Sequence, residues 1–390
     1  MPNPLIKRYL CMTDLRVFES KAAEDLVGHH DARIPDGFPC VVDIDGKPVD
    51  AINDYLLDAY FVSCSVSSLK TLRTYAEHLA DWFATLSRNR ITWSYARSSD
   101  LVSYRSALLR PTGINGKSLA TTTINDRLSC VIRHYRWANT RNISLSKSML
   151  TLISSDNSRT GLYVSPKRRT LLVKKYQYLP RAINPDHLDD LLKNLNNPYR
   201  LIALWALYSG ARRGEIAMLR TGDIFSASVE VQVLCELEVK TKGGGYRTLY
   251  VPNTIVSKTK RYMAELSAKN PNFPLDGAGL LWRNRFGQTI TPAAITSAFY
   301  RARVASKFPR RVRFHDLRHT YAINTLRSLY VIAKAKPIAP LKMLQRLLGH
   351  RSIESTMIYI KSIEEDPSTL NEDLGFLNGE VLEGMVSEGA

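Results

Sequence analysis

The chain has 390 residues, which is enough for two or three domains that each bury a core of their own. Its 44% hydrophobic and 23% charged residues are ordinary for a soluble globular protein, and its longest apolar run, Leu201 to Tyr208, is far too short to span a membrane. Lysine and arginine outnumber aspartate and glutamate by 54 to 36, and the net charge of +18 favours nucleic acid as a partner over a membrane surface. A basic enzyme without such a partner is the alternative.

The positive charge is unevenly distributed along the chain. Residues 361–390 contain one basic and eight acidic residues, a net of −7, so the preceding 360 residues carry +25. The sequence therefore predicts a polycationic body followed by an acidic C-terminal tail over residues 362–390. Several apolar residues of the tail fall on one face of a short helical pattern, which suits a docking segment as well as a frayed end.

The five cysteines are scattered, with no Cys-x-x-Cys pair and no histidine at ligand spacing. This pattern indicates thiols in a reducing compartment and argues against a structural zinc site. The first residues lack the apolar core of a secretory signal. We therefore expect a cytoplasmic protein associated with the nucleoid.

Residues 1–61 are expected to form an N-terminal extension, to which we assign no function. Within it, residues 41–49 alternate around Asp45-Gly46, which predicts a short β-hairpin. Residues 62–155 have helical periodicity and are predicted to form a helical domain that binds DNA. Three helices are expected there, over residues 67–86, 99–109 and 121–139. The third has an apolar face and an opposite face of arginines that either contacts DNA or is ordinary solvated surface: Arg127, Arg133, Arg136 and Arg141.

Residues 156–183 are predicted to be a basic interdomain linker. Between residues 157 and 185 the sequence has seven basic residues, no acidic residue and three prolines, which interrupt regular structure. Such a segment either lies along a duplex backbone and bridges two domains or serves as a flexible tether.

Residues 184–361 are predicted to be a second, mainly α-helical domain. Asn184-Pro185 starts a helix that runs to about residue 195, and the apolar stretch Leu201 to Tyr208 forms the next. Residues 230–240 and 246–252 flank three glycines and predict an antiparallel hairpin. Helical periodicity resumes at about residue 292 and continues to 359. The expected fold class is mainly α with a small antiparallel β-sheet in the second domain.

Residues suited to phosphodiester chemistry occur in a fixed order in this second domain. The sequence contains Gly210-x-Arg212-x-x-Glu215, a lysine at the hairpin turn, His315-x-Leu-Arg318-His319, Leu-Gly-His350, and then Tyr359 nine residues after His350. A tyrosine can attack phosphorus and hold the product as a phosphotyrosine, while cationic groups stabilise the charge that develops on the phosphoryl oxygens. Each signal alone is weak, but their order and spacing together are specific.

This set of motifs resembles the tyrosine recombinase, or phage integrase, family of site-specific DNA recombinases. The resemblance covers about residues 180–361 with the full set of motifs and extends more loosely over residues 62–155, which are similar to the family's helical core-binding domain. It implies a two-domain clamp on DNA that cleaves and rejoins strands through a 3′-phosphotyrosyl intermediate, for integration, excision or transposition.

The resemblance also implies a role for each matching residue. Arg212 and Arg318 would bind non-bridging oxygens of the scissile phosphate, for which a planar and permanently charged guanidinium is suited. His315 would bind the same phosphate and assist proton movement, and His350 would steady the phosphoryl group or the phenol. Tyr359 would be the nucleophile. Glu215 matches an acidic position that helps to orient the site, although a structural ion pair is the simpler interpretation.

The lysine is the ambiguous member of this set. In the family, a lysine on the hairpin turn protonates the leaving 5′-oxygen. Lys240 and Lys242 lie on the same face of the strand. Lys242 immediately precedes the glycines and is the better match, with Lys240 as the alternative.

The same resemblance defines the expected partners. These are double-stranded DNA, further copies of the chain in a tetramer on DNA, and possibly accessory DNA-bending or directionality proteins. Neither a metal nor ATP is expected, because the cationic side chains offset the transition-state charge and the phosphotyrosine conserves the bond energy. A topoisomerase of type IB, with a similar residue set acting on one duplex, and a DNA-binding regulator that has lost catalysis are the competing functions.

Overall fold

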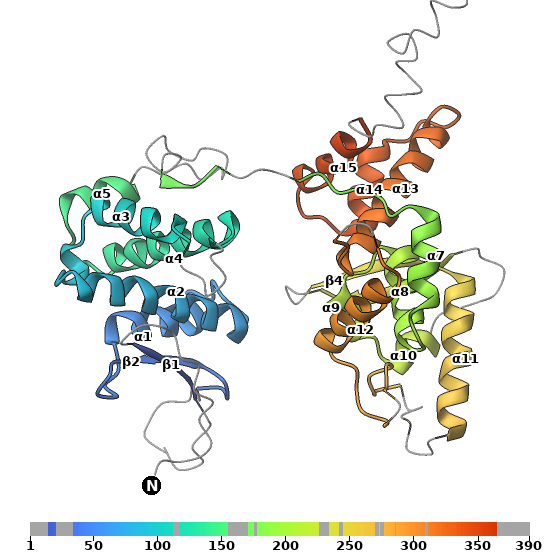
Figure 1. The fold of residues 1–390 in the computed structure, drawn as a ribbon, viewed down its shortest axis with the longest axis horizontal. Helices are drawn as coiled ribbons and strands as arrows, with labels where there is room; N and C mark the ends of the chain where they lie inside the picture. The colour runs from blue at the N-terminus through green and yellow to red at the C-terminus, as the bar shows by residue number, and fades with distance from the viewer. Residues whose placement is uncertain are drawn as a thin grey trace, which may run out of the picture. The chain divides into compact units, whose positions relative to one another are not determined.

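The computed structural model divides the chain into two compact units, residues 1–176 and residues 177–390, which are described separately (Figure 1). It describes the following residues: 15–20, 34–111, 118–154, 171–174, 178–225, 234–241, 245–269, 273, 277–284, 286–308 and 311–364. Lys242, most of the predicted linker and the acidic tail beyond residue 364 lie outside these residues.

Unit 1 is mainly helical and has one small sheet. Its elements, in chain order, are β1 (Arg16–Glu19), β2 (Pro39–Val42), α1 (Asp50–Leu57), a π-helical segment (Asp58–Val62), α2 (Leu69–Arg88), a 3-10 turn (Trp93–Tyr95), α3 (Ser98–Leu109), α4 (Thr121–Thr140) and α5 (Lys147–Ser154).

The sheet of unit 1 differs from the hairpin predicted over residues 41–49. The strand β2 pairs antiparallel with β1, with Val17 opposite Val41. Only a single bridge, between Val42 and Pro48, forms across the Asp45-Gly46 turn. The turn itself was recognised correctly, since Gly46 has a φ of +83°. The longer ladder lies with a strand more than twenty residues upstream, which local alternation could not reveal.

The three helices predicted for this unit are present, and α2 and α4 pack side by side (Figure 1). Trp82 on α2 and Tyr135 on α4 are fully buried between them. Trp82 Nε1 donates to Tyr135 Oη at 3.3 Å, and Tyr135 Oη donates to the Trp93 carbonyl at 2.7 Å. These two aromatic side chains are therefore joined by hydrogen bonds that satisfy their polar atoms.

The arginines on the outer face of α4 are largely engaged within the unit. Arg127 forms an ion pair with Asp81 on α2, and Arg141 forms one with Asp58. Arg133 lies 5.0 Å from the centre of the Tyr75 ring, a cation–π contact. These side chains thus attach α4 to its neighbours, whatever further contacts they make.

Unit 2 is a set of helices around a two-stranded antiparallel sheet. Its elements are α7 (Pro185–Lys193), α8 (Tyr199–Ser209), α9 (Arg213–Ala217), α10 (Thr221–Phe225), β3 (Leu234–Lys240), β4 (Tyr246–Pro252), α11 (Asn253–Lys269), α12 (Pro292–Ala305), α13 (His315–Ala333), α14 (Pro340–Leu348) and α15 (Glu354–Glu364).

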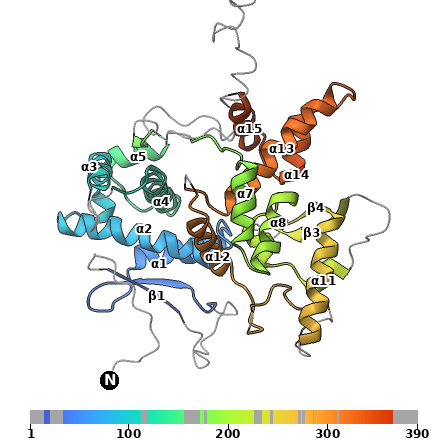
Figure 2. The same cartoon turned by 45° about the vertical axis from the view of Figure 1, so that its right-hand side comes forward.

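The apolar helix α8 is the centre of unit 2 and packs against α13 and β4 (Figure 2). The preceding helix α7 starts where the sequence predicts, since Asn184 Oδ1 caps it by accepting from the Asp186 N–H at 2.9 Å. Trp205 is fully buried and donates to Thr259 on α11 at 2.9 Å. The sheet pairs Leu237 with Leu249. The fold class predicted from the sequence, mainly α with a small antiparallel sheet, is confirmed.

The last three helices form a second, smaller core in unit 2. Both views place α13, α14 and α15 together (Figures 1 and 2). Leu326 on α13, Leu344 and Leu348 on α14, and Tyr359 on α15 are all buried in it. A tyrosine on the last described helix is therefore packed against the helix that starts at His315.

Candidate active site

The end of α8 and the start of α9 place Arg212 and Glu215. Gly210 ends α8 with a φ of +63°, and a Cβ there would lie 2.5 Å from the Tyr321 ring, so both the conformation and the space require glycine. Glu215 lies three residues after Arg212 and accepts from its backbone N–H at 2.7 Å and from its Nη1 at 2.9 Å. The carboxylate thus fixes both the backbone and the side chain of Arg212.

Glu215 is also held by a second arginine, Arg247 on β4. Arg247 donates from Nη2 to one carboxylate oxygen at 2.7 Å and from Nε to the other at 3.2 Å, and from Nη1 to the Leu347 carbonyl at 2.9 Å. Burial alone would raise the pKa of the Glu215 carboxyl, but the bonds and charges of Arg247 and Arg212 lower it below its ordinary value. Glu215 is therefore ionised, and its ion pair with Arg247 joins β4, α9 and the end of α14.

Arg318 on α13 is only 2% exposed. Its Nη1 donates to the Gly210 carbonyl, and its Nη2 donates to the Leu348 carbonyl at 2.7 Å and to Nε2 of His350 at 3.2 Å. Burial, followed by the charges of Arg212 and Arg247, lowers its pKa to about 10, so it stays protonated at neutral pH. The ends of two helices thus hold a buried positive charge in one orientation.

His350 follows Gly349, which ends α14 with a φ of +61°. Because Nε2 accepts from Arg318, Nδ1 must carry the ring proton, and it donates to Thr356 Oγ1 at 2.9 Å. Burial and then the charge of Arg318 lower the pKa of His350 to about 4. The imidazole is therefore neutral at physiological pH, and both ring nitrogens are engaged.

Tyr359 on α15 is 2% exposed, and its hydroxyl lies 3.0 Å from Nδ1 of His319. Burial raises the pKa of the phenol, and the charges of Arg318 and then Arg212 oppose that rise. The phenol thus lies in the electrostatic field of both arginines.

His315 completes the group from the first turn of α13. Its ring packs edge-on against that of His319, with centroids 4.6 Å apart. Burial and then the proximity of His319 and Arg318 lower the pKa of His315 to about 4. Five of the six residues predicted from the sequence to be catalytic are therefore assembled in one region of unit 2: Arg212, His315, Arg318, His350 and Tyr359.

The hairpin lysine cannot be placed in the same way. Lys242 lies outside the described residues, whereas Lys240 is the last residue of β3, exposed and opposite Tyr246. The hairpin that carries both lysines is the one that carries Arg247 into the site. The choice between the two lysines stays a prediction.

Sequence reasoning missed three participants in this hydrogen-bond network. Arg247 looked like any charged strand residue, and only the tertiary structure shows that its side chain is 7% exposed. Thr356 belongs to none of the sequence motifs. His319 was visible in the His315-x-x-Arg318-His319 string, and its position one residue after an arginine predicted to be catalytic was the signal that could have identified it.

A cavity of about 870 Å³ opens beside Arg212 and His315. It lies between α9, α12 and the segment before α13, and aromatic rings line part of its wall. Five arginines also line it: Arg212, Arg213, Arg303, Arg311 and Arg313. A hollow with this excess of positive charge suits a polyanion at the entrance to the site.

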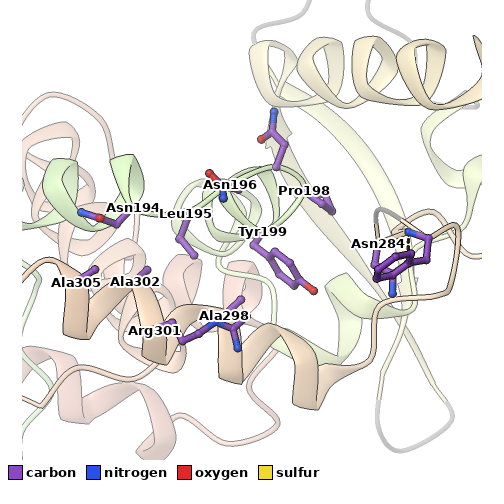
Figure 3. Close-up of a pocket in the computed structure, with 12 residues that line it drawn as sticks. Asn194, Leu195, Asn196, Pro198, Tyr199, Asn284, Ala298, Arg301, Ala302 and Ala305 are labelled. Carbon is purple, nitrogen blue, oxygen red and sulfur yellow. Dashed lines mark hydrogen bonds between the residues drawn. The ribbon is translucent and has the colours of Figure 1, made fainter. Parts of the chain in front are cut away.

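A second cavity, of about 480 Å³, lies between the turn that joins α7 to α8 and one face of α12 (Figure 3). Asn194, Tyr199 and Arg301 are among its lining residues. None of the residues predicted to be catalytic lines it.

Within the described part of the chain, no group of histidine, cysteine, aspartate and glutamate side chains could hold a metal ion. No helix there is long and apolar enough to cross a membrane. Four of the cysteines are described, and all are present as thiols: Cys40, Cys64, Cys130 and Cys235.

Comparison with known families identifies both units. Residues 181–365 match the phage integrase family, and residues 54–142 match the N-terminal SAM-like domain of phage integrases. The chain belongs to the phage integrase family of tyrosine recombinases. It is a site-specific recombinase of the tyrosine type, which binds DNA and cleaves and rejoins its strands.

Individual relatives agree with this assignment. The chain is 26% identical to a tyrosine recombinase XerD of Rickettsia bellii over 293 residues, covering 70% of the chain and 88% of the relative. It is 28% identical to XerD of Caulobacter vibrioides over 305 residues, covering 74% of the chain and 85% of the relative.

Two solved structures share the fold. XerH recombinase bound to its palindromic difH substrate, in a post-cleavage complex, superposes with a TM-score of 0.56 at 19% identity, covering 80% of this chain and 81% of that one. A lambda integrase dimer bound to a COC′ core site gives 0.52 at 15% identity, covering 81% and 78%.

Proposed function

We propose that Tyr359 is the nucleophile of this recombinase and that cleavage leaves a 3′-phosphotyrosyl bond and a free 5′-hydroxyl. The observation that carries the proposal is the position of the buried phenol in the field of Arg318 and Arg212. A phosphate bound between these guanidinium groups would lie near the phenol oxygen, and its negative charge would be offset there. The reaction serves integration, excision or transposition of DNA.

The two arginines are suited to different parts of this task. Arg318 is buried and fixed by carbonyl groups, so its charge is in place before DNA binds. The Arg212 side chain is 38% exposed and is oriented by Glu215 while still open to a ligand. One arginine supplies a fixed field and the other an accessible fork for phosphate oxygens.

The remaining members of the set are assigned to the phosphate and the leaving group. His315 is neutral at physiological pH, since its pKa is lowered to about 4, and can donate a hydrogen bond to the phosphate without adding a full charge. His350 is neutral for the same reason, and with both ring nitrogens engaged it would steady the site around the phosphoryl group or the phenol. Lys242, or else Lys240, would protonate the leaving 5′-oxygen. The cation-lined cavity beside Arg212 supports a path for the DNA backbone to this point.

We further propose that the protein acts as a homotetramer on double-stranded DNA, with residues 184–361 as the catalytic domain and residues 62–155 as the helical DNA-binding domain. The net charge of +18 supports a clamp on a polyanion, and the lambda integrase structure holds a dimer on its core site.

The acidic tail, residues 362–390, would dock on a neighbouring copy. Accessory DNA-bending or directionality proteins would join this assembly, in the cytoplasm on the nucleoid.

Covalent capture tests the nucleophile. A pool of nicked DNA duplexes with randomised sequences is incubated with the full chain, and adducts that survive SDS are collected and sequenced. Wild-type protein should retain the strand that ends in a 3′-phosphate, and the released strand should have a 5′-hydroxyl. Tyr359→Phe should give no adduct.

Tyr330→Phe is the matched control, because Tyr330 is exposed on α13. It should capture DNA as efficiently as wild type. Adduct formation by Tyr359→Phe, or its absence with wild type, contradicts the proposal.

A further inference from the structure

The hydroxyl of Tyr359 faces a histidine that has no role in the proposed site. Nδ1 of His319 lies 3.0 Å from the Tyr359 oxygen, and the two ring centroids are 5.7 Å apart. The contact joins α13 to α15 at the atom that would attack phosphorus. A phenol buried in this way is un-ionised at neutral pH, because burial raises its pKa, and an un-ionised phenol is a weak nucleophile.

We propose that His319 is the general base that takes the proton from Tyr359 as the phenol oxygen attacks the scissile phosphate. The inference rests on the proposed function, in which Tyr359 is the nucleophile. Its geometric basis is that Nδ1 is already within hydrogen-bonding distance of the oxygen that must lose its proton.

The neighbouring charges leave His319 able to accept a proton. Burial lowers its pKa, the carboxylate of Asp316 acts in the opposite direction, and the charge of Arg318 lowers it further. His315 packs against the ring but is itself neutral above about pH 4. At neutral pH His319 is therefore an uncharged imidazole, and the tautomer with its proton on Nε2 presents the lone pair of Nδ1 to the phenol.

The other two histidines of the site are placed for other tasks. Both ring nitrogens of His350 are engaged, with Arg318 and with Thr356. Its ring lies almost parallel to that of Tyr359, with an interplanar angle of 10° and centroids 6.4 Å apart. The face of the imidazole, and not one of its nitrogens, is therefore turned towards the phenol. His315 meets the ring of His319. Among these histidines, His319 is the one whose nitrogen reaches the phenol oxygen.

The step is balanced in atoms and charge. The proton on the phenol oxygen passes to Nδ1 of His319, and the electron pair of that O–H bond becomes available for the new O–P bond. The bond between phosphorus and the 5′-oxygen breaks, and the leaving oxygen takes a proton from the ammonium group of the hairpin lysine. When the strands are rejoined, the lysine recovers its proton from the attacking 5′-hydroxyl and imidazolium returns its proton to the phenol.

A spectroscopic test needs no DNA. The full chain is labelled with ¹⁵N in its histidine rings, and the His319 resonances are assigned by their loss in His319→Asn. The proposal expects Nδ1 to be unprotonated at neutral pH and to shift in Tyr359→Phe, where its donor is removed. A proton on Nδ1 would show that His319 donates to the phenol, and would overturn the proposal whatever the protein does with DNA.

A kinetic test separates basicity from positioning. Asparagine can place a neutral oxygen near the position of Nδ1, so His319→Asn preserves an acceptor but removes the base. With a duplex recovered by covalent capture, we expect cleavage to slow by at least about 100-fold while DNA affinity stays within about twofold. Replacing Tyr359 by a difluorotyrosine, which has a more acidic phenol, should restore at least about tenfold of the lost rate in the variant, because less proton transfer is then needed.

Controls make the outcomes distinct. His187→Gln, at an exposed histidine of α7, should cleave like wild type. Urea unfolding of His319→Asn, compared with that of wild type, confirms that the variant is folded. Cleavage within about threefold of wild type, or a slow rate that difluorotyrosine does not improve, means that His319 only positions the phenol. Failure of wild type itself to form an adduct contradicts the proposed function instead, and the nitrogen resonances then still decide which group donates the proton.

Discussion

Two glycines at helix ends set the positions of the side chains of the candidate site. Gly210 and Gly349 both have φ near +60°, which other residues adopt only with strain. Their neighbours also leave no room for a side chain, because a Cβ at Gly349 would lie 2.5 Å from Cδ of Arg247. The carbonyls of Gly210 and Leu348 then point to Arg318. At the scale of single residues, the site depends on backbone conformation as much as on its charged groups.

We expect Gly349→Ala to lower the free energy of unfolding by about 1–3 kcal/mol, because it strains the backbone and displaces Arg247. It should also reduce covalent capture of DNA, since His350 follows directly. Urea unfolding of the purified chain measures the first effect. Gly214→Ala is the control: a Cβ there meets no atom within 4 Å, so helix α9 should be unchanged or stabilised by up to about 1 kcal/mol. Equal stability of Gly349→Ala and wild type would contradict the argument.

At the scale of elements, one buried ion pair connects three parts of unit 2. Glu215 belongs to α9, Arg247 to β4, and the carbonyl of Leu347 to α14. The side chains of Glu215 and Arg247 are 4% and 7% exposed. Removing one partner of such a pair leaves a buried charge without compensation, whereas removing both leaves less of a penalty. The hairpin is therefore part of the scaffold that orients Arg212.

We expect Arg247→Met to destabilise the chain by about 3–5 kcal/mol. It should also lower covalent capture of DNA, because Arg247 then no longer holds the carboxylate of Glu215 that orients Arg212. The double variant Arg247→Met with Glu215→Gln should be more stable than the sum of the two single effects predicts. Urea unfolding of all three variants gives this coupling. Arg261→Met removes an exposed pair on α11 as a control and should change stability by at most about 0.5 kcal/mol. Strict additivity of the first two substitutions would rule out the coupling.

At the scale of the whole molecule, each unit has a hydrophobic core of its own. The core of unit 1 contains a fully buried histidine, His134, surrounded by aromatic rings and donating from Nε2 to the Ala51 carbonyl at 2.8 Å. Burial lowers its pKa to about 4. The unfolded chain, in which histidine titrates near pH 6.5, therefore binds a proton more readily than the folded chain between these two values.

The direction of the pH dependence of stability follows from that difference in proton binding. The contribution of His134 to stability is fully present above about pH 6.5 and is lost as the pH falls towards 4, by about 3 kcal/mol in total. His134→Phe should flatten the decline of the urea midpoint between pH 7 and pH 4.5. His187→Gln, on the surface of unit 2, should leave the slope unchanged. The same slope in His134→Phe and wild type would contradict this assignment.

The sequence predicted most of the helices and most of the site, for local reasons. Periodic apolar residues identify α2, α4 and α8, because a helix that buries one face shows it every three or four positions. The order of Arg212, His315-x-x-Arg318, His350 and Tyr359 indicated the chemistry, and the family comparison confirmed the class of protein. The pairing of β2 with β1 was not predicted, since a strand does not encode locally which distant segment it pairs with.

What the sequence determined by itself is therefore the class of protein, and it also supplied the candidate residues for the chemistry, since both depend on residue type and spacing. Only the tertiary structure decided which of them meet. It buries Arg247 beside Glu215 and turns Nδ1 of His319 towards Tyr359, two contacts between segments 32 and 40 residues apart. Such contacts arise from how helices and strands pack, and a side chain shows its partner only when that packing is complete.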